Sequence, residues 1–230
     1  GHDFGPEAAQ TRRAAAQVDG ILGDILRGIE ERGVQDEVNL MVVSDHGMAE
    51  VEPRQVIFLE DYLNPNCCRI LGSGANLQIF PPDGAEERVF DSISKAHPHM
   101  RAYRKSEIPA RLHFSSHRRI PPILVTADEG WFLRARKSNL RPPRGYHGYD
   151  NRYRSMHGIF AGRGPDFAEG VVIDSVQAID LYNLMAAVLS ISPAPNRGDI
   201  NRVRSLLSPA ARAVTGRRDA SRHRSYRPAS

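Results

Sequence analysis

The sequence contains little cysteine and no long apolar run. Its two cysteines, Cys67 and Cys68, are adjacent, and neighbouring cysteines rarely bridge each other because the required geometry is strained. Their spacing fits no zinc-binding motif either, so we expect two free thiols and no disulfide-stapled scaffold. No apolar run approaches the ~18–20 residues needed to span a membrane, so no transmembrane segment is predicted.

The sequence also has neither an initial methionine nor an Asn-x-Ser/Thr site. Because the chain begins Gly1-His2-Asp3, we expect its native N-terminus to be absent. The missing signal peptide therefore does not exclude export. The missing acceptor site gives no support for a glycosylated surface.

Positive charge is concentrated at one end of the chain. The net charge is +4, but the segment from Ser208 to Ser230 alone carries +5, which leaves the preceding residues near −1. The segment has one acid, Asp219, and six arginines: Arg212, Arg217, Arg218, Arg222, Arg224 and Arg227. Its composition predicts disorder from about residue 208. We therefore predict no specific nucleic-acid partner, with a polyanion-binding arm as the alternative.

Apolar spacing predicts an α/β fold. A helix is expected between Pro6 and Gly33, followed by a strand over 38–43 that is buried on both faces of a sheet. Further strands are expected at 77–80, 100–104, 123–125 and 159–161, and further helices at 84–97 and 176–188. This alternation predicts a mostly parallel central sheet flanked by helices. Residues 50–130 are expected to form a mixed sub-region within it.

Asp45-His46 is the strongest local signal for chemistry. The pair directly follows the strand expected at 38–43, and open α/β sheets bind ligands at the carboxyl ends of their strands. Consecutive strand residues point to opposite faces, so the two can share one metal only where the backbone turns, as Gly47 permits. A carboxylate and an imidazole are both good zinc ligands. The alternative is that Asp45 caps the turn and His46 is structural.

Two further histidines lie in loops flanked by glycine. His2 precedes the first expected helix, whose N-terminus suits an anion such as phosphate. His147 lies in the long loop over 134–155, within Gly145-Tyr146-His147-Gly148, and loops of that length are commonly functional or disordered. Taken singly, each of these histidines is more often a surface residue than a ligand.

The remaining polar candidates favour structural roles. His97 and His99 flank a proline at an expected helix end, where a cationic histidine suits the helix dipole. Adjacent acids such as Asp128-Glu129 usually serve a turn or a salt bridge. Three isolated histidines are also expected to be structural or exposed: His113, His117 and His157.

Together, four motifs resemble the nucleotide pyrophosphatase/phosphodiesterase family of the alkaline phosphatase superfamily. They are Gly1-His2-Asp3-Phe4-Gly5-Pro6, Ser44-Asp45-His46-Gly47-Met48, Ala127-Asp128-Glu129-Gly130-Trp131 and Gly145-Tyr146-His147-Gly148-Tyr149-Asp150-Asn151. The resemblance covers 1–192, read as the C-terminal portion of a catalytic domain, and leaves 193–230 as an extension. It implies an alkaline-phosphatase-like fold that is truncated at its N-terminus.

The resemblance also implies two zinc ions in one active site. Asp45 and His46 match ligands of the first ion, and His2 and His147 match ligands of the second. The family's threonine nucleophile and its remaining metal-binding aspartates lie before the position of His2, so these residues contain no counterpart to them. A nucleotide or another phosphodiester is the implied substrate, and a periplasmic or extracellular location is plausible for the family.

We therefore expect the parent protein to hydrolyse phosphodiester or nucleotide pyrophosphate bonds with zinc, and these 230 residues to be inactive alone. One alternative is a non-catalytic remnant that keeps part of the fold and of the metal site. Another is a related hydrolase of phosphonate or sulfate esters, because fold does not fix function.

Overall fold

The computed structural model describes residues 1–213, which form two compact units. The first unit comprises 1–19 and 45–158, and the second comprises 20–44 together with the described residues from 159 onward. All four candidate metal ligands belong to the first unit. Each unit is described by itself.

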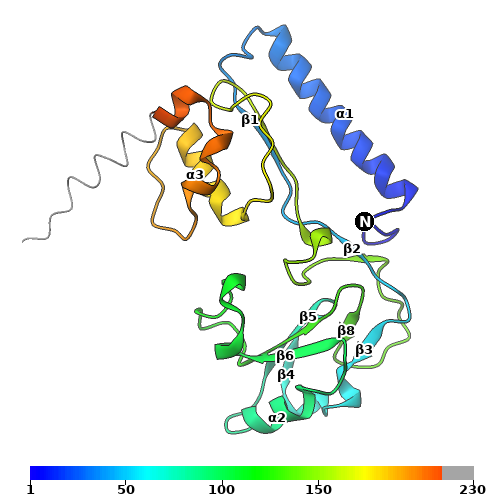
Figure 1. Ribbon diagram of the computed structural model, residues 1–230. Coiled ribbons are helices and arrows are strands. Elements are labelled where there is room, and N and C mark those ends of the chain that lie inside the picture. The colour runs from blue at the N-terminus through cyan, green and yellow to red at the C-terminus, as the bar shows by residue number, and fades with distance from the viewer. Residues whose placement is uncertain (214–230) are drawn as a thin grey trace, which may run out of the picture. The chain divides into compact units, whose positions relative to one another are not determined.

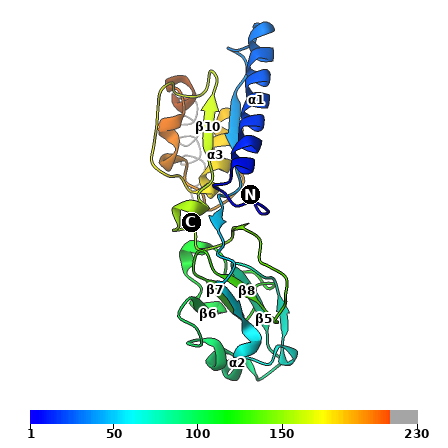
Figure 2. The same ribbon diagram turned by 90° about the vertical axis from the view of Figure 1, so that its right-hand side faces the viewer.

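The first unit is built on a four-stranded antiparallel sheet in the order β4-β5-β7-β6, of which Figure 1 labels β4, β5 and β6 and Figure 2 labels β7. The strands are β4 (Arg69–Leu71), β5 (Asn76–Phe80), β6 (Met100–Arg104) and β7 (Ile123–Ala127). Alternate residues of β5 are buried, as expected of a strand with one face on the core. Leu77, Ile79, Ile123 and Val125 have no exposed surface. Helix α2 (Glu86–Ile93) contacts β6 and adds Val89 and Ile93 to this core.

Two short pairs of strands carry the loops of the first unit. β3 (Val56–Phe58) pairs in parallel with β8 (Phe132–Arg134). β2 (Ala49–Glu50) pairs in antiparallel fashion with β9 (Gly145–Tyr146). The second pairing brings the chain that follows Asp45-His46 beside the chain that precedes His147. It therefore joins two candidate segments about a hundred residues apart in sequence.

The second unit contains a two-stranded antiparallel sheet and a helix (Figure 2). β1 (Leu40–Val43) pairs with β10 (Phe160–Arg163), and α3 (Ala178–Val188) supplies Leu184 to their shared apolar cluster. Two 3₁₀ turns over 200–206 add Val203 and Leu206 to the same cluster. Residues of the predicted C-terminal extension thus belong to this core.

Helix α1 (Ala9–Glu31) lies within the predicted span and ends as predicted. Gly33 has a φ of +66°. The Gly33 N–H donates to Glu30 O, and the Val34 N–H donates to Ile29 O, which is the Schellman arrangement that follows from a left-handed residue after the last turn. The apolar face of the helix is largely exposed, since Val18 and Ile21 are 66% and 60% exposed.

The predicted α/β class is confirmed, but the predicted predominance of parallel strands needs correction. Among residues 1–213, β3–β8 is the one parallel pair of named strands. A parallel crossover needs a dozen or more residues, whereas 72–75 alone connect β4 to β5. β1 also differs from the prediction, because it is half-buried rather than buried on both faces.

Three smaller predictions concern the chain's surface and its end. Cys67 and Cys68 are both free. No described helix combines the length and the apolar character needed to cross a bilayer. The predicted disordered segment falls largely outside the described residues, and within them Ser208 and Ala211 are buried.

Candidate metal centre

His2 is fixed by the chain that leads to His147. Its Nδ1 lies 2.8 Å from the carbonyl oxygen of Gly145, and its own carbonyl accepts the N–H of Arg144 at 2.8 Å. A carbonyl oxygen can only accept, so Nδ1 carries the proton and the neutral ring keeps its lone pair on Nε2. Metal-binding histidines commonly have this arrangement, in which the second nitrogen donates to a backbone carbonyl.

His46 shows the same arrangement one turn after β1. Its Nδ1 donates to the carbonyl oxygen of Gly47 at 2.7 Å. Its Nε2 faces Asp45 Oδ2 at 3.2 Å, and Asp45 Oδ1 accepts the backbone N–H of His46 at 2.9 Å. The two side chains therefore face each other across the turn, so one cation could contact both of them.

Gly47 is required by space rather than by backbone freedom. Gly47 does not have a positive φ, so the prediction that its backbone freedom permits the turn is corrected. A Cβ at this position would overlap the carbonyl oxygen of Ser155 and come within 2.6 Å of that of His157. The N–H of Gly47 also donates to Met156 O at 3.0 Å. The Asp45-His46 turn is thus packed directly against the backbone of 155–157.

His147 brings the candidate residues together. Its ring centroid lies 3.6 Å from that of His46, with the planes stacked at 18°, and 5.2 Å from that of His2. All three imidazoles and the Asp45 carboxylate thus belong to one cluster, which we call the candidate metal centre. The loop over 145–151 carries His147 into it.

The electrostatics of the cluster favour a neutral His147. Burial lowers the pKa of His147 from its usual value, and the nearby His46 and His2 lower it further, against an opposing effect of Asp45. The neutral ring is the form that binds a metal ion. His46 and His2 thus favour the deprotonated state of His147, which is the state that binds a cation.

The side chains do not yet have the geometry of a bound ion. Across residues 1–213, no group of three or more His, Cys, Asp or Glu side chains is already arranged to hold a metal. Imidazole lone pairs lie in the ring planes, so those of the stacked His46 and His147 do not converge on one point. The donor types fit a divalent cation such as zinc, and ring rotations would be needed to direct the donors at it.

A second histidine cluster in the first unit was not found from the sequence. His99 stacks on Trp131 with centroids 4.3 Å apart, and its Nδ1 lies 3.1 Å from Asp128 Oδ2. His97 lies 5.0 Å from Trp131, edge to face, and its Nδ1 accepts the N–H of His99. We call these residues the Trp131 cluster. They come from the turn before β6 and from the turn between β7 and β8, so no local pattern could have revealed their contact.

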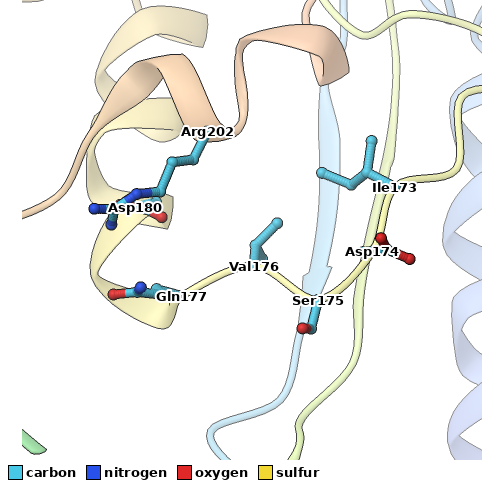
Figure 3. A pocket seen from close by; sticks show the side chains of 7 residues that line it. All are labelled: Ile173, Asp174, Ser175, Val176, Gln177, Asp180 and Arg202. Carbon is cyan, nitrogen blue, oxygen red and sulfur yellow. The ribbon is translucent and has the colours of Figure 1, made fainter. Parts of the chain in front are cut away.

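A hollow in the second unit has no comparable chemistry. It measures about 280 Å³ and is lined by Ile173, Asp174, Ser175, Val176, Gln177, Asp180 and Arg202 (Figure 3). Its described lining contains neither histidine nor cysteine. Asp180 is fully buried, where its Oδ1 accepts the N–H of Asp199 at 2.7 Å and faces Arg202 at 3.4 Å. This carboxylate thus holds the turn over 199–202 against α3.

The sequence is similar to known phosphodiesterases and nucleotide pyrophosphatases. The model of a family described as type I phosphodiesterase/nucleotide pyrophosphatase matches residues 1–150. Bis(5'-adenosyl)-triphosphatase of Mus musculus is 34% identical over 208 residues, which cover 90% of this chain and 45% of that protein. Ectonucleotide pyrophosphatase/phosphodiesterase family member 5 of Homo sapiens is 31% identical over 210 residues, which cover 91% and 44%.

A solved structure gives the same relationship. An inactive variant of murine ectonucleotide pyrophosphatase/phosphodiesterase 5, in complex with AMP, matches with a TM-score of 0.85 and 35% identity, over 90% of this chain and 55% of that one. This likeness confirms the predicted alkaline-phosphatase-like fold. The chain spans about half the length of the curated relatives it matches.

Proposed function

The chain belongs to the type I phosphodiesterase/nucleotide pyrophosphatase family, and we propose that it contributes to zinc-dependent hydrolysis of phosphodiester or nucleotide pyrophosphate bonds. The observation that carries the proposal is the convergence of His2, His46 and His147 beside Asp45. The named relatives favour this branch of the superfamily over phosphonate or sulfate ester hydrolysis. Because the chain spans about half of those relatives, the activity proposed is that of the whole protein.

The proposed ligands divide into two pairs. Asp45 and His46 would hold one zinc ion, since a carboxylate oxygen and Nε2 face each other there. His2 and His147 would hold the second, since His2 keeps its Nε2 lone pair and His147 favours its neutral form. Zinc supplies positive charge that neutralises a phosphate and polarises its P–O bonds. The chain's own contribution is to fix the ring tautomers and to keep four donors on one patch.

The substrate proposed is a nucleotide or another phosphodiester. Support comes from the relatives, one of which is described as bound to AMP and another as a bis(5'-adenosyl)-triphosphatase. A phosphate group suits a cluster of cations next to neutral imidazoles, because its negative charge requires compensation in a partly dehydrated site.

Zinc binding is the first test. We expect the 230-residue chain to bind Zn²⁺ weakly, because a catalytic zinc usually has three protein ligands and each proposed pair supplies two. Competition with a chromogenic chelator measures the affinity. His46→Ala is expected to weaken it, whereas His117→Ala is the matched control, since His117 is exposed and its Nδ1 accepts the N–H of Arg119. Equal affinities for the two variants would contradict the proposed centre.

Turnover is the second test. We propose that these residues alone do not hydrolyse a chromogenic phosphodiester with added zinc, because the resemblance gives them no counterpart of the threonine nucleophile. Turnover that His147→Ala abolishes would overturn the proposed inactivity and would support the metal centre. Turnover that survives His147→Ala would count against both.

A further inference from the structure

The loop that carries His147 is fixed firmly on its N-terminal side. Gly145 and Tyr146 form β9, in register with Glu50 and Ala49 of β2. The Tyr146 ring lies directly over Gly74, where any Cβ would overlap it. Its hydroxyl donates to the Ser73 carbonyl at 3.2 Å. This side of the loop is therefore positioned by backbone pairing and by ring packing.

The C-terminal side of the loop depends on side chains. Tyr149 is buried, and its hydroxyl donates to the Trp131 carbonyl at 2.9 Å. Asp150 receives both ends of the Arg111 guanidinium: Nη1 donates to Oδ1 at 2.8 Å, and Nη2 donates to Oδ2. Nη1 also donates to Asn151 Oδ1 at 2.6 Å. The hydrogen bonds that Arg111 donates to Asp150 lower the pKa of this carboxyl group from its usual value.

Arg111 lies in a turn that packs against buried apolar residues. It lies in the 3₁₀ turn over Ala110–Leu112, and Leu112 packs against the buried Ile108, Ile120 and Leu124. Leu124 belongs to β7, so the turn that carries Arg111 is anchored to the central sheet of the first unit. A bidentate arginine–carboxylate pair adds geometric specificity to its energy. It therefore sets the orientation of the loop as well as its attachment.

We propose that Arg111 is a positioning residue for His147, acting through Asp150 to hold the loop over 145–151 where its imidazole meets His2 and His46. This inference rests on the proposed function, because it assigns a task to Arg111 in the candidate metal centre. No sequence motif indicated Arg111, which lies 39 positions from Asp150.

Arg104 provides a matched control in the same unit. It also pairs with carboxylates, those of Glu87 and Glu107, and its side chain is 26% exposed against 28% for Arg111. It lies over the Phe90 ring, 3.6 Å from the centroid. None of its partners belongs to the loop of His147. The Arg104→Ala variant thus measures how much the loss of an arginine–carboxylate network changes zinc affinity when that network does not contact the candidate metal centre.

The experiment compares zinc affinity and the His147 ring in variants of the full chain. Arg111→Ala is expected to weaken Zn²⁺ binding by about 10- to 100-fold, the effect typical of removing a group that orients a ligand. Arg104→Ala is expected to leave the affinity unchanged. Arg111→Lys keeps the charge but loses the planar fork, so it should fall between the parent and Arg111→Ala. Thermal unfolding shows that each variant is folded, and Arg111→Lys carries the test if Arg111→Ala is not.

A metal-free measurement keeps this inference separate from the proposed function. Long-range ¹H–¹⁵N spectra report each imidazole, and Arg111→Ala or Arg111→Lys should shift the His147 resonances while Arg104→Ala does not. Unchanged His147 resonances in both Arg111 variants would overturn the positioning role. Absence of zinc binding that depends on His147 would overturn the metal centre instead. Weaker binding in Arg104→Ala to the same degree as in Arg111→Ala would show a general structural effect and contradict the inference.

Discussion

The first unit contains two clusters of histidine beside a carboxylate, and the Nδ1 atoms of their rings have different partners. In the candidate metal centre, His2 and His46 donate from Nδ1 to backbone carbonyls. In the Trp131 cluster, His97 accepts a backbone N–H on Nδ1, so its neutral ring carries the proton on Nε2. His99 donates from Nδ1 to Asp128 and covers one face with Trp131.

We infer from this difference that proximity alone does not make a metal site. A ligand nitrogen needs a free lone pair directed into an open volume, and second-shell hydrogen bonds decide which nitrogen keeps it. Backbone carbonyls of Gly145 and Gly47 serve this purpose in the candidate metal centre. In the Trp131 cluster, Nδ1 of His97 accepts a backbone N–H, Nδ1 of His99 donates to Asp128, and His99 stacks on Trp131.

The largest expected contrast is in zinc affinity. Replacing His2 and His147 together by alanine should weaken Zn²⁺ binding by more than about 100-fold, because loss of a single outer-shell partner already costs up to that factor. Replacing His97 and His99 together should leave the affinity within about twofold of the parent, since neither directs a lone pair into the centre. Equilibrium competition with a chelator measures both. Comparable losses in the two double variants would remove the distinction between the clusters.

The glycine beside each cluster gives the next contrast. Gly47→Ala should destabilise the chain by about 3 kcal/mol, because its Cβ would overlap the backbone behind the metal centre. Gly130, beside the Trp131 cluster, has a φ of +83° and no Cβ neighbour closer than 3.3 Å. Gly130→Ala should therefore cost about 1–2 kcal/mol, the strain of a left-handed alanine. Urea unfolding measures both free energies, and a larger cost at Gly130 would contradict this packing argument.

The smallest expected effect is on the pH dependence of stability, to which His147 and His97 both contribute. Burial is the main cause that lowers the pKa of both His147 and His97 from the usual 6.5. The unfolded chain then binds more protons than the folded one below pH 6.5, so stability falls as pH decreases towards the lowered values. Both His147→Gln and His97→Gln should flatten this dependence without zinc.

Zinc should separate the two histidines, because protons compete with the metal for its ligands. Saturating Zn²⁺ should steepen the loss of stability below pH 6.5 in the parent and in His97→Gln, and much less in His147→Gln. Urea unfolding at a series of pH values with and without zinc provides the measurement. A zinc effect lost in His97→Gln and kept in His147→Gln would invert the assignment.

Local patterns in the sequence predicted helices α1 to α3 and the strands of four or five residues, but not the strands of two or three residues. The glycine end of α1, the strand over 100–104 and the strand over 123–125 all occur close to their predicted positions. These predictions depend on periodicity and on turn residues, which act over a few positions. The pairing of strands depends on the connections between them and on contacts between distant residues. The predicted parallel sheet was therefore wrong in strand direction, because the four-stranded sheet is antiparallel.

The four candidate metal ligands were predicted from motifs, but the residues that pack around them and position them were not. His2, Asp45, His46 and His147 were named from four short motifs in register, and the structure brings them together. Arg111 and the Trp131 cluster depend on contacts between residues far apart in the chain. The space filled by the backbone at 155–157 behind Gly47 could not be deduced from the turn alone.

The most direct measurement is an anomalous difference map at the zinc edge from crystals of the chain grown with Zn²⁺. The account predicts peaks at the candidate metal centre, one between His2 and His147 and one between Asp45 and His46, at zinc–ligand distances of about 2.0–2.2 Å. A peak confined to the Trp131 cluster, or ordered rings at the centre without any peak in saturating zinc, would contradict it.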